Sequence, residues 1–228
     1  MSDIKKYIKL VEDIEKRTYK GDAKEFGGTS IKGTGAAPAI KWLVSNGIIT
    51  SGMKVLDYGA GKYGRNALYL KEMGCEVYAY DPYNGVDDDG WVGVSSTLPQ
   101  SKDFDLGFTS FVLNVVPGNI EDDIISEIDL FCDTSVHITR NMDIYDTVKN
   151  ALERKDKAVV EFFENDYATD ELKEKLHNGT LSKEDIVSFC EHGVVTSKSP
   201  PRFQRIPDLS GKGFEPTRLN YKFKIYKK

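Results

Sequence analysis

The sequence VLDYGAGKYG, residues 55–64, decides how the rest of the chain folds. A short apolar run contains the acidic residue Asp57, and glycines follow at positions 59, 61 and 64. This is the G-x-G-x-x-G spacing of a turn between a strand and a helix, where glycines let the backbone approach a ligand closely. The stretch therefore predicts a strand–turn–helix unit with a ligand-binding turn.

Strand and helix patterns alternate around this unit, from residue 53 to residue 139. Short apolar runs that fit strands alternate with stretches of helical spacing, which is typical of a parallel sheet with helices on both faces. The closing segment RLNYKFKIY, residues 218–226, alternates apolar and polar residues and predicts one antiparallel strand at the sheet edge. The fold class is therefore α/β with a mainly parallel sheet.

The 228 residues are of ordinary length for a single domain. Apolar residues follow helical spacing over residues 3–20, and APAIKWLVSNG, residues 37–47, predicts a second helix with Pro38 in its first turn. The run AVVEFF, residues 158–163, predicts a strand between later helices. We divide the domain into N-terminal helices (1–50), a cofactor-binding core (51–140), a helical insertion (141–195) and closing strands (196–228).

The composition indicates a soluble globular protein, with 39% hydrophobic and 29% charged residues. No run approaches the ~18 apolar residues of a membrane helix, and the first residues lack the apolar core of a signal peptide. The three cysteines, Cys75, Cys132 and Cys190, are odd in number and have no metal-ligand spacing. We expect reduced thiols in a cytoplasmic protein, with no metal site and no membrane partner.

The net charge of −5 is unevenly distributed along the chain. Residues 196–228 contain nine Lys or Arg and two acidic residues, whereas residues 35–195 contain fourteen basic and twenty-eight acidic residues. A basic end on an acidic body favours a polyanion, so nucleic acid is a candidate partner of the basic residues in 198–228. A solvated edge strand protected by lysines is the alternative interpretation.

Asp57 narrows the choice of ligand. A carboxylate at this strand end would repel a phosphate in the glycine turn by about 4 kcal/mol at a ~4 Å spacing and an effective dielectric near 20. The acid therefore argues against a dinucleotide and for a ligand that carries positive charge here. S-adenosylmethionine fits: its ammonium can be held by Asp57 or the neighbouring backbone, while its carboxylate takes the N–H groups of the turn.

Asp81 is the second predicted anchor, because it ends the next strand, 22 residues after Gly59. An acid at this position is well placed to accept hydrogen bonds from both hydroxyls of a ribose. Dinucleotides and S-adenosylmethionine share that ribose. Asp81 therefore predicts a nucleoside without discriminating between the two cofactors.

Residues 54–84, KVLDYGAGKYGRNALYLKEMGCEVYAYDPYN, resemble the first motif block of class I S-adenosylmethionine-dependent methyltransferases. GTGAAPAIKWLVSNGII, SFVLNVVPG, VHITR and the closing strands are similar, more narrowly, to a group of bacterial and phage methyltransferase-like proteins, including those associated with DNA phosphorothioation loci. The resemblance implies a Rossmann-like, mainly parallel, seven-stranded sheet with an antiparallel last strand. Its cofactor would be S-adenosyl-L-methionine.

Carried over to this chain, the resemblance places Asp57, Gly59 and Gly61 at the methionine end of the cofactor and Asp81 at its ribose. Tyr58 and Ala60 would supply backbone contacts. The chain departs from the family after Asp81, where NGVDDDGWVGVSSTLPQ replaces most of the usual second helix. Either Ser95, Ser96 or Thr97 lines the adenine pocket there, or the segment is an ordinary surface loop.

In this family, groups from the loop after the fourth strand face the transferred methyl, which makes Asn114 the candidate catalytic residue. Amino-group DNA methyltransferases have Asp/Asn/Ser-Pro-Pro-aromatic in this loop, but here Asn114 stands in LNVVPG without that motif. Asn114 alternatively braces the turn, since Asn and Gly around a Pro are turn formers. We expect His137 to be a packed strand residue.

The sequence thus predicts an S-adenosylmethionine-dependent methyltransferase whose acceptor is open, with nucleic acid among the candidates. One alternative is a protein that consumes S-adenosylmethionine by other chemistry, such as a lyase or hydrolase. Another is a non-catalytic nucleic-acid-binding partner. It would use Arg202 and Gln204, or Phe203 and Arg205, on phosphates and the tail aromatics Tyr221, Phe223 and Tyr226 on bases.

Overall fold

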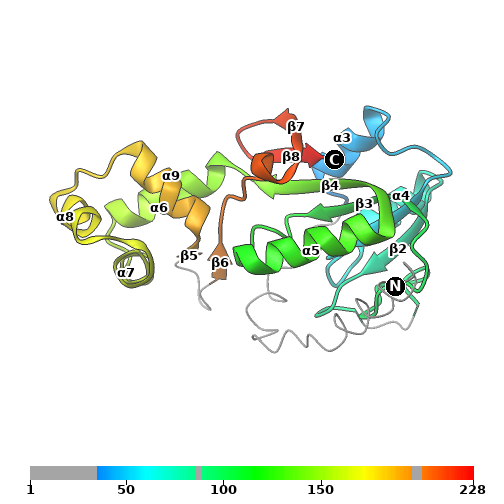
Figure 1. Cartoon of the computed structure of the whole chain (residues 1–228), viewed down its shortest axis with the longest axis horizontal. Coiled ribbons are helices and arrows are strands. Elements are labelled where there is room, and N and C mark those ends of the chain that lie inside the picture. Colours follow the sequence, from blue (N-terminus) through cyan, green and yellow to red (C-terminus); the bar gives the residue numbers. More distant parts are fainter. Residues whose placement is uncertain (1–34, 86–88, 197–201) are drawn as a thin grey trace, which may run out of the picture.

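The computed structural model describes residues 35–85, 89–196 and 202–228. The predicted helix at 3–20 lies outside these residues, as do residues 86–88 of the acidic loop. Figure 1 shows a central sheet with helices on both sides and a further group of helices at one end.

A six-stranded sheet forms the centre of the molecule, in the order β2-β1-β3-β4-β8-β7. The first four strands along the chain are parallel to one another, and β8 is antiparallel to β4. The mainly parallel sheet with an antiparallel last strand is thus confirmed. The strands are β1 (Lys54–Tyr58), β2 (Glu76–Tyr80), β3 (Phe104–Ser110), β4 (Cys132–Arg140), β7 (Glu215–Leu219) and β8 (Phe223–Lys227).

Within the described ranges, three helices cover the two faces of this sheet. Helices α3 (Pro38–Ser45) and α4 (Arg65–Glu72) contribute to one apolar core, and α5 (Gly118–Phe131) contributes to the other. Side chains alternate along a strand, so Val55 joins the α3/α4 core while its neighbour Leu56 joins the α5 core. The helix that begins with Pro38, predicted from the sequence, is confirmed as α3.

The direction in which strands are added reverses at β1, because β2 pairs with one of its edges and β3 with the other. The fold is therefore a Rossmann-like, doubly wound α/β sheet. In sheets of this kind, ligands bind outside the carboxyl ends of the strands at the point of reversal.

The prediction of seven strands is wrong, because the outer edge of β2 is covered by an irregular segment. The N–H of Ala79 donates to the carbonyl of Gly90, that of Ser95 to Ala79, and that of Asp81 to Ser95, each at 2.9 Å. A Cβ at Gly90 would lie 2.5 Å from the Tyr78 ring. The backbone at Gly90 passes too close to the Tyr78 ring for a regular strand with side chains. Isolated hydrogen bonds therefore satisfy the backbone groups at the edge of β2 instead.

The single strand predicted for residues 218–226 is also wrong, because these residues form most of the β7–β8 hairpin. The side chain of Asn220 makes the turn: its Oδ1 accepts the N–H groups of Lys222 and Phe223, both at 2.9 Å. This local hydrogen bonding is what makes Asn a turn residue. The hairpin places two antiparallel strands at this end of the sheet.

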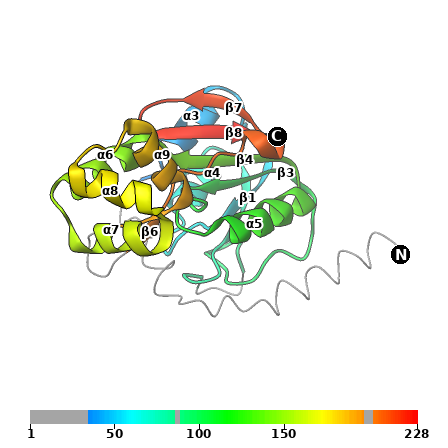
Figure 2. The ribbon, with the colours of Figure 1, turned by 60° about the vertical axis from the view of Figure 1, so that its left-hand side comes forward.

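Residues 142–192 fold into helices that Figures 1 and 2 show together at one end of the molecule. The strand predicted at 158–163 is wrong: Asp156 caps a helix there, and Val159 and Phe163 pack into a third apolar core, four residues apart. The elements are α6 (Met142–Glu153), α7 (Lys157–Phe162), the π-helical turn η1 (Phe163–Tyr167), α8 (Asp170–Asn178) and α9 (Lys183–His192). A two-stranded sheet of β5 (Val194–Thr196) and β6 (Arg202–Gln204) follows.

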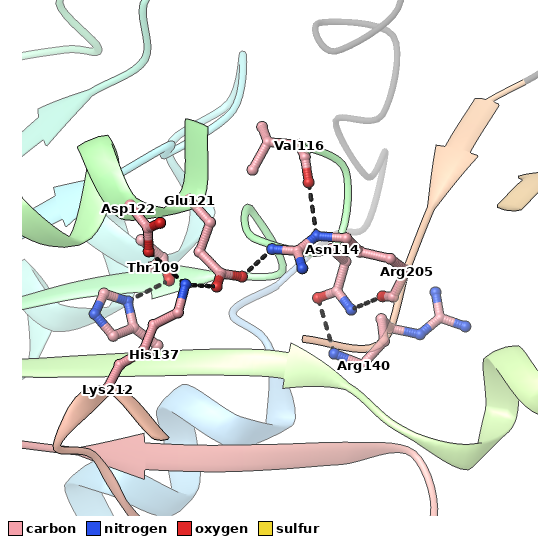
Figure 3. A network of polar contacts seen from close by, with 9 residues as sticks. All are labelled: Thr109, Asn114, Val116, Glu121, Asp122, His137, Arg140, Arg205 and Lys212. Carbon is pink, nitrogen blue, oxygen red and sulfur yellow. Dashed lines mark hydrogen bonds and ion pairs between the residues drawn. The ribbon is translucent and has the colours of Figure 1, made fainter. Parts of the chain in front are cut away.

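Several basic residues of the closing segment, residues 202–228, form ion pairs with acidic residues of α5. Arg205 and Lys212 both bind Glu121, and Lys228 binds Asp129 at 2.7 Å. Figure 3 shows the first two contacts. These ion pairs hold the closing segment against α5. Arg205 is only 7% exposed and is therefore unavailable to a phosphate.

The three cysteines are free thiols, with Cys75 and Cys190 buried. Burial raises the pKa of the Cys190 thiol to about 12, so this thiol is inert at neutral pH. None of the helices in the described ranges combines the length and apolar character needed to cross a membrane.

Candidate functional site

A cavity of about 380 Å³ lies at the carboxyl ends of β1, β2 and β3, where the sheet reverses direction. This volume is in the range of small-molecule sites, roughly 300–1,000 Å³. Its wall comes from the segments before α3, around the glycine turn, after β2, after β3 and at the start of α5. The lining residues are 35–38, 58–61, 63–66, 81–84, 110–112, 115, 116, 120 and 124.

The glycine turn is tied to the end of β2 by its own backbone. The N–H groups of Gly59 and Ala60 donate to the carbonyl of Tyr80, at 2.8 and 2.9 Å. The N–H of Gly61 donates to Oδ2 of Asp81 at 2.8 Å. These three donors are engaged within the protein, so the expectation that they receive the carboxylate of a ligand gains no support from the geometry.

Gly59 is required for two separate reasons. Its φ of +79° is rarely adopted by residues with side chains, and a Cβ at this position would lie 2.3 Å from Cγ2 of Val112. Gly47 has a similar φ of +69° but open space around it. Comparing substitutions at Gly59 and Gly47 therefore separates the cost of backbone strain from the cost of steric overlap.

We expect Gly59→Ala to lower the free energy of unfolding more than Gly47→Ala does. Strain at positive φ costs about 1 kcal/mol at either position, and overpacking against Val112 adds about 1–3 kcal/mol at position 59 alone. Val112→Ala in the Gly59→Ala background should recover most of the additional loss. Urea unfolding of the wild-type protein and the three variants checks this, and equal losses for the two single glycine substitutions would contradict it.

Asp81 lies on the cavity wall, as expected for the predicted ribose acid. Its Oδ1 accepts the N–H groups of Tyr83 (3.0 Å) and Asn84 (2.8 Å) and the side-chain amide of Asn84 (3.1 Å). Among the residues that the structure describes, its Oδ2 accepts only the N–H of Gly61. Since a carboxylate has about four acceptor positions, two on each oxygen, Oδ2 retains room for one hydroxyl of a ligand.

Asp57 lies behind the turn and is not among the residues that line the cavity. Its neighbours across the sheet, Ala79 and Phe108, belong to the α3/α4 core, and its side chain is fully buried. Neither carboxylate oxygen has a hydrogen-bond partner in normal geometry within the described residues. Its predicted contact with an ammonium stays a prediction.

Burial of the Asp57 carboxyl raises its pKa from 3.8 to about 8, and the nearby Asp81 carboxylate raises it further in the same direction. Smaller opposing effects come from the backbone N–H of Ala67 and the ammonium of Lys71. The Asp57 carboxyl is therefore mostly neutral at pH 7. A cation placed near it would favour ionisation, so this group can respond to a charged ligand in the cavity.

Asn114 makes the contacts of a brace (Figure 3). Its side-chain amide donates to the carbonyl of Arg205 at 2.7 Å, and its Oδ1 accepts the N–H of Arg140 at 2.8 Å. It is fully buried and does not line the cavity. These contacts match the structural role that the sequence left open, and the catalytic role stays a prediction without a supporting contact.

Ser95 and Thr97 hydrogen-bond to each other, hydroxyl to hydroxyl, at 2.9 Å, and neither lines the cavity. The adenine-pocket interpretation of this segment therefore gains no support.

His137 is fully buried in the α5 side of the sheet, with Nδ1 2.9 Å from the hydroxyl of Thr109. Burial lowers the pKa of its imidazole to about 3, and the prediction of a packed strand histidine is confirmed.

Among the wall residues that sequence reasoning missed are Arg65, Tyr83 and Phe111. Arg65 follows the last glycine of the motif, and its position at a helix start was a usable indication. Burial, together with the Asp81 carboxylate, raises the pKa of the Tyr83 phenol to about 12, so it stays neutral. Phe111 has a φ of +62° at the end of β3, and no sequence pattern marks that conformation.

The wall is largely apolar, with few charged groups. Asp81 is its acid and Arg65 its only cation among the residues that the structure places, and no His or Cys from those ranges lines it. No group of three His, Cys, Asp or Glu side chains in the described part could hold a metal ion. The cavity thus suits a ligand with an apolar or aromatic body and a small number of polar groups.

No protein-family model matches the sequence, and no curated protein matches it. Among solved structures, the chain is similar to magnesium protoporphyrin IX methyltransferase from Synechocystis PCC 6803 with bound SAH (15% identity, TM-score 0.44, 83% of this chain and 78% of that one). It is similar to 1,6-didemethyltoxoflavin-N1-methyltransferase from Burkholderia thailandensis, solved with its substrate and S-adenosylhomocysteine (13%, 0.48, 100% and 90%). A structure described as putative Zn-dependent alcohol dehydrogenases from Rhodobacter sphaeroides is also similar (12%, 0.49, 86% and 90%). At these identities and TM-scores, neither ligand nor activity carries over to this chain.

Proposed function

We propose that the fold and the cavity define an enzyme that binds a nucleoside cofactor at the reversal point of its sheet. The proposal rests above all on the hydrogen bond that joins Gly61 of the turn to Asp81 at the cavity wall. This bond ties the glycine turn to the residue predicted to bind the ribose, 20 residues away, and so supports the proposal that both serve one ligand. More particularly, we propose an S-adenosylmethionine-dependent methyltransferase of class I.

The residues present fit this cofactor in two respects. Asp81 retains an acceptor position for a ribose hydroxyl. The buried Asp57 carboxyl, without a hydrogen-bond partner among the described residues, would be stabilised as the anion by a nearby ammonium or sulfonium. A pyrophosphate would have the opposite effect and would keep the Asp57 carboxyl in its neutral form.

The chain's own contribution to the reaction is mostly positioning. When bound, S-adenosylmethionine supplies a sulfonium whose methyl group is already electrophilic. Asp81 would orient the ribose, and the apolar residues Val115, Val116 and Ile120 would exclude water beside the reacting groups. The wall offers no histidine or cysteine from the described ranges, so an acceptor that is itself nucleophilic fits best.

A nucleic acid would use the exposed part of the basic tail, where Tyr221 is 52% exposed beside Lys222 and Lys224. However, Arg205 is buried, and Tyr226 is 1% exposed with its hydroxyl 3.2 Å from Asp208. Much of the predicted nucleic-acid surface is thus committed to the fold, which makes a small-molecule acceptor the stronger expectation.

We expect the protein to transfer labelled methyl from S-adenosylmethionine to one fraction of a cell extract separated into nucleic acids, proteins and small molecules. Asp81→Asn should reduce the transferred label at least tenfold, because it weakens both the turn and the ribose contact. Asp103→Asn, a change at an exposed acid paired with Lys54, serves as the matched control and should retain activity.

The same incubation without any extract separates the alternatives. Breakdown of S-adenosylmethionine in the absence of an acceptor would indicate a lyase or hydrolase. Label in no fraction, with the cofactor intact, would count against the proposed methyl transfer.

A further inference from the structure

The loop after β3, residues 111–117, forms part of the cavity wall and is held in place by Arg205 (Figure 3). The backbone N–H of Arg205 donates to the carbonyl of Asn114, and its Nε donates to the carbonyl of Val116, both at 2.8 Å. Asn114 returns the contact, because its side-chain amide donates to the carbonyl of Arg205 at 2.7 Å. Two carbonyls of this loop therefore receive hydrogen bonds from one residue that lies 91 and 89 positions further along the chain.

Arg205 also holds the start of α5, the helix that follows this loop. Its guanidinium forms an ion pair with Glu121, which is 2% exposed. Ile120, just before Glu121 in the sequence, and Ile124, one turn after Ile120, both line the cavity. The N-cap of α5, Pro117, makes no side-chain hydrogen bond to the helix start. One guanidinium thus fixes both the loop and the first turn of α5, which together form this side of the wall.

The next residue in the chain, Ile206, is attached to the helical insertion. Its side chain is 4% exposed and packs into the third apolar core. Its N–H donates to the carbonyl of Cys190, in α9, at 2.8 Å. No residue separates Ile206 from Arg205, and consecutive Cα atoms keep a fixed spacing. A shift of Ile206 with the insertion helices therefore moves Arg205 directly.

We infer that Arg205 is a positioning residue through which the helical insertion, residues 141–195, controls the shape of the cavity and its affinity for the ligand. Arg205 does not line the cavity, and neither does any residue of the insertion that the structure describes. The insertion therefore acts on the ligand through the contacts of Arg205 with the loop and with α5. This inference rests on the proposed function and deepens it, because it assigns how that ligand site is regulated.

Calorimetric titration of the full chain with S-adenosylhomocysteine tests the inference in a matched pair of variants. Ile206→Ala and Ile186→Ala remove the same atoms from the third apolar core, where the two side chains are 4% and 6% exposed. Both chain neighbours of Ile186 lie within α9. Ile206→Ala should weaken binding by about 3- to 30-fold, the usual range for coupling between separate sites. Ile186→Ala should change it by less than about twofold, and equal weakening by both would overturn the inference.

A second variant addresses Arg205 itself. Arg205→Lys keeps a cation beside Glu121 and loses the planar fork that also reaches the carbonyl of Val116, so it should weaken binding by about 3- to 30-fold. Combining it with Ile206→Ala should weaken binding by less than the product of the two single effects, because both substitutions act through one residue. A full product would show that Ile206 acts by another route.

Hydrogen exchange of the ligand-free proteins supplies a readout that needs no ligand. The peptide of residues 111–120 should exchange about tenfold faster in Ile206→Ala than in Ile186→Ala, because the loop has lost its external support. If circular dichroism shows that either alanine variant is unfolded, Ile206→Val and Ile186→Val give the same comparison with smaller effects in the same direction.

These measurements separate the inference from the proposed function. Unchanged exchange of residues 111–120, in a wild-type protein that binds S-adenosylhomocysteine, overturns the role of Arg205 and leaves the proposed function in place. Faster exchange in Ile206→Ala, in a protein whose wild type does not bind S-adenosylhomocysteine, overturns the proposed function and supports the coupling between the insertion and the cavity wall.

Discussion

Replacing Asp57 by asparagine is expected to stabilise the ligand-free protein by several kcal/mol more at pH 8 than at pH 5. The unfolded chain releases the Asp57 proton near pH 3.8, whereas the native state holds it to about pH 8. Between these values the native state binds more protons, so wild-type stability falls as pH rises, by about 1.4 kcal/mol per pH unit for this group. The asparagine side chain has no proton to lose in this range, so the substitution removes that slope.

Urea unfolding of both proteins at pH 5 and pH 8 measures the effect. The difference between them isolates Asp57, because His137 contributes equally to both. Its pKa is lowered to about 3, so its own contribution runs the other way, with stability lost as pH falls below about 6.5. Asp103→Asn is the control, and it should show no such difference between pH 5 and pH 8. Identical pH profiles for wild type and Asp57→Asn would contradict the burial of an uncompensated carboxyl.

The same substitution has an opposite expected effect on ligand affinity. If a bound ammonium lies near Asp57, binding should release the Asp57 proton at pH 7, and Asp57→Asn should abolish that release. Titrations in buffers with different ionisation enthalpies count this proton. A protein that becomes more stable while losing affinity shows the trade between stability and function that buried charges at ligand sites produce.

Breaking the ion pair between Glu121 and Arg205 is the second large expected effect. Their side chains are 2% and 8% exposed, and Arg205 also donates to the carbonyl of Val116 at 2.8 Å. Glu121→Gln should lower the free energy of unfolding by about 3–5 kcal/mol, because it leaves a buried guanidinium without its anion. Chemical denaturation at pH 7 measures this loss.

A double variant tests the physical reason. Adding Arg205→Met to Glu121→Gln removes the stranded charge and should recover much of the stability, since an apolar residue of similar size is tolerated at such sites. Lys149→Gln breaks an exposed pair with Glu153 at 3.7 Å and should change stability by less than about 0.5 kcal/mol. If Glu121→Gln lowers the free energy of unfolding no more than Lys149→Gln does, the Glu121–Arg205 ion pair does not hold the closing segment in place.

The parts of the fold that sequence predicted best are those decided locally. The alternation around residues 54–80 and the prolyl start of α3 follow from side-chain period and backbone chemistry within a few residues. The prediction of a strand at 158–163 was wrong because a run of Val and Phe residues fits either a strand or a helix. The segment is helical because Asp156 caps the start of the helix and its apolar side chains pack into the third apolar core, whose other residues lie elsewhere in the sequence.

Features that depend on distant contacts were not predictable. The seventh strand is missing because Gly90 passes against the Tyr78 ring, and Asn114 is a brace because it meets a carbonyl 91 residues away. The position of Asp57 was open to prediction, since a period of two places it on the same sheet face as Val55.

Titration of the wild-type protein with S-adenosylhomocysteine tests the central claim most directly. The cavity at the reversal of the sheet, with Asp81 joined to the glycine turn, predicts saturable heat with one site per chain and a dissociation constant in the micromolar range. Absence of binding up to millimolar ligand would contradict the claim that this cavity takes S-adenosylmethionine.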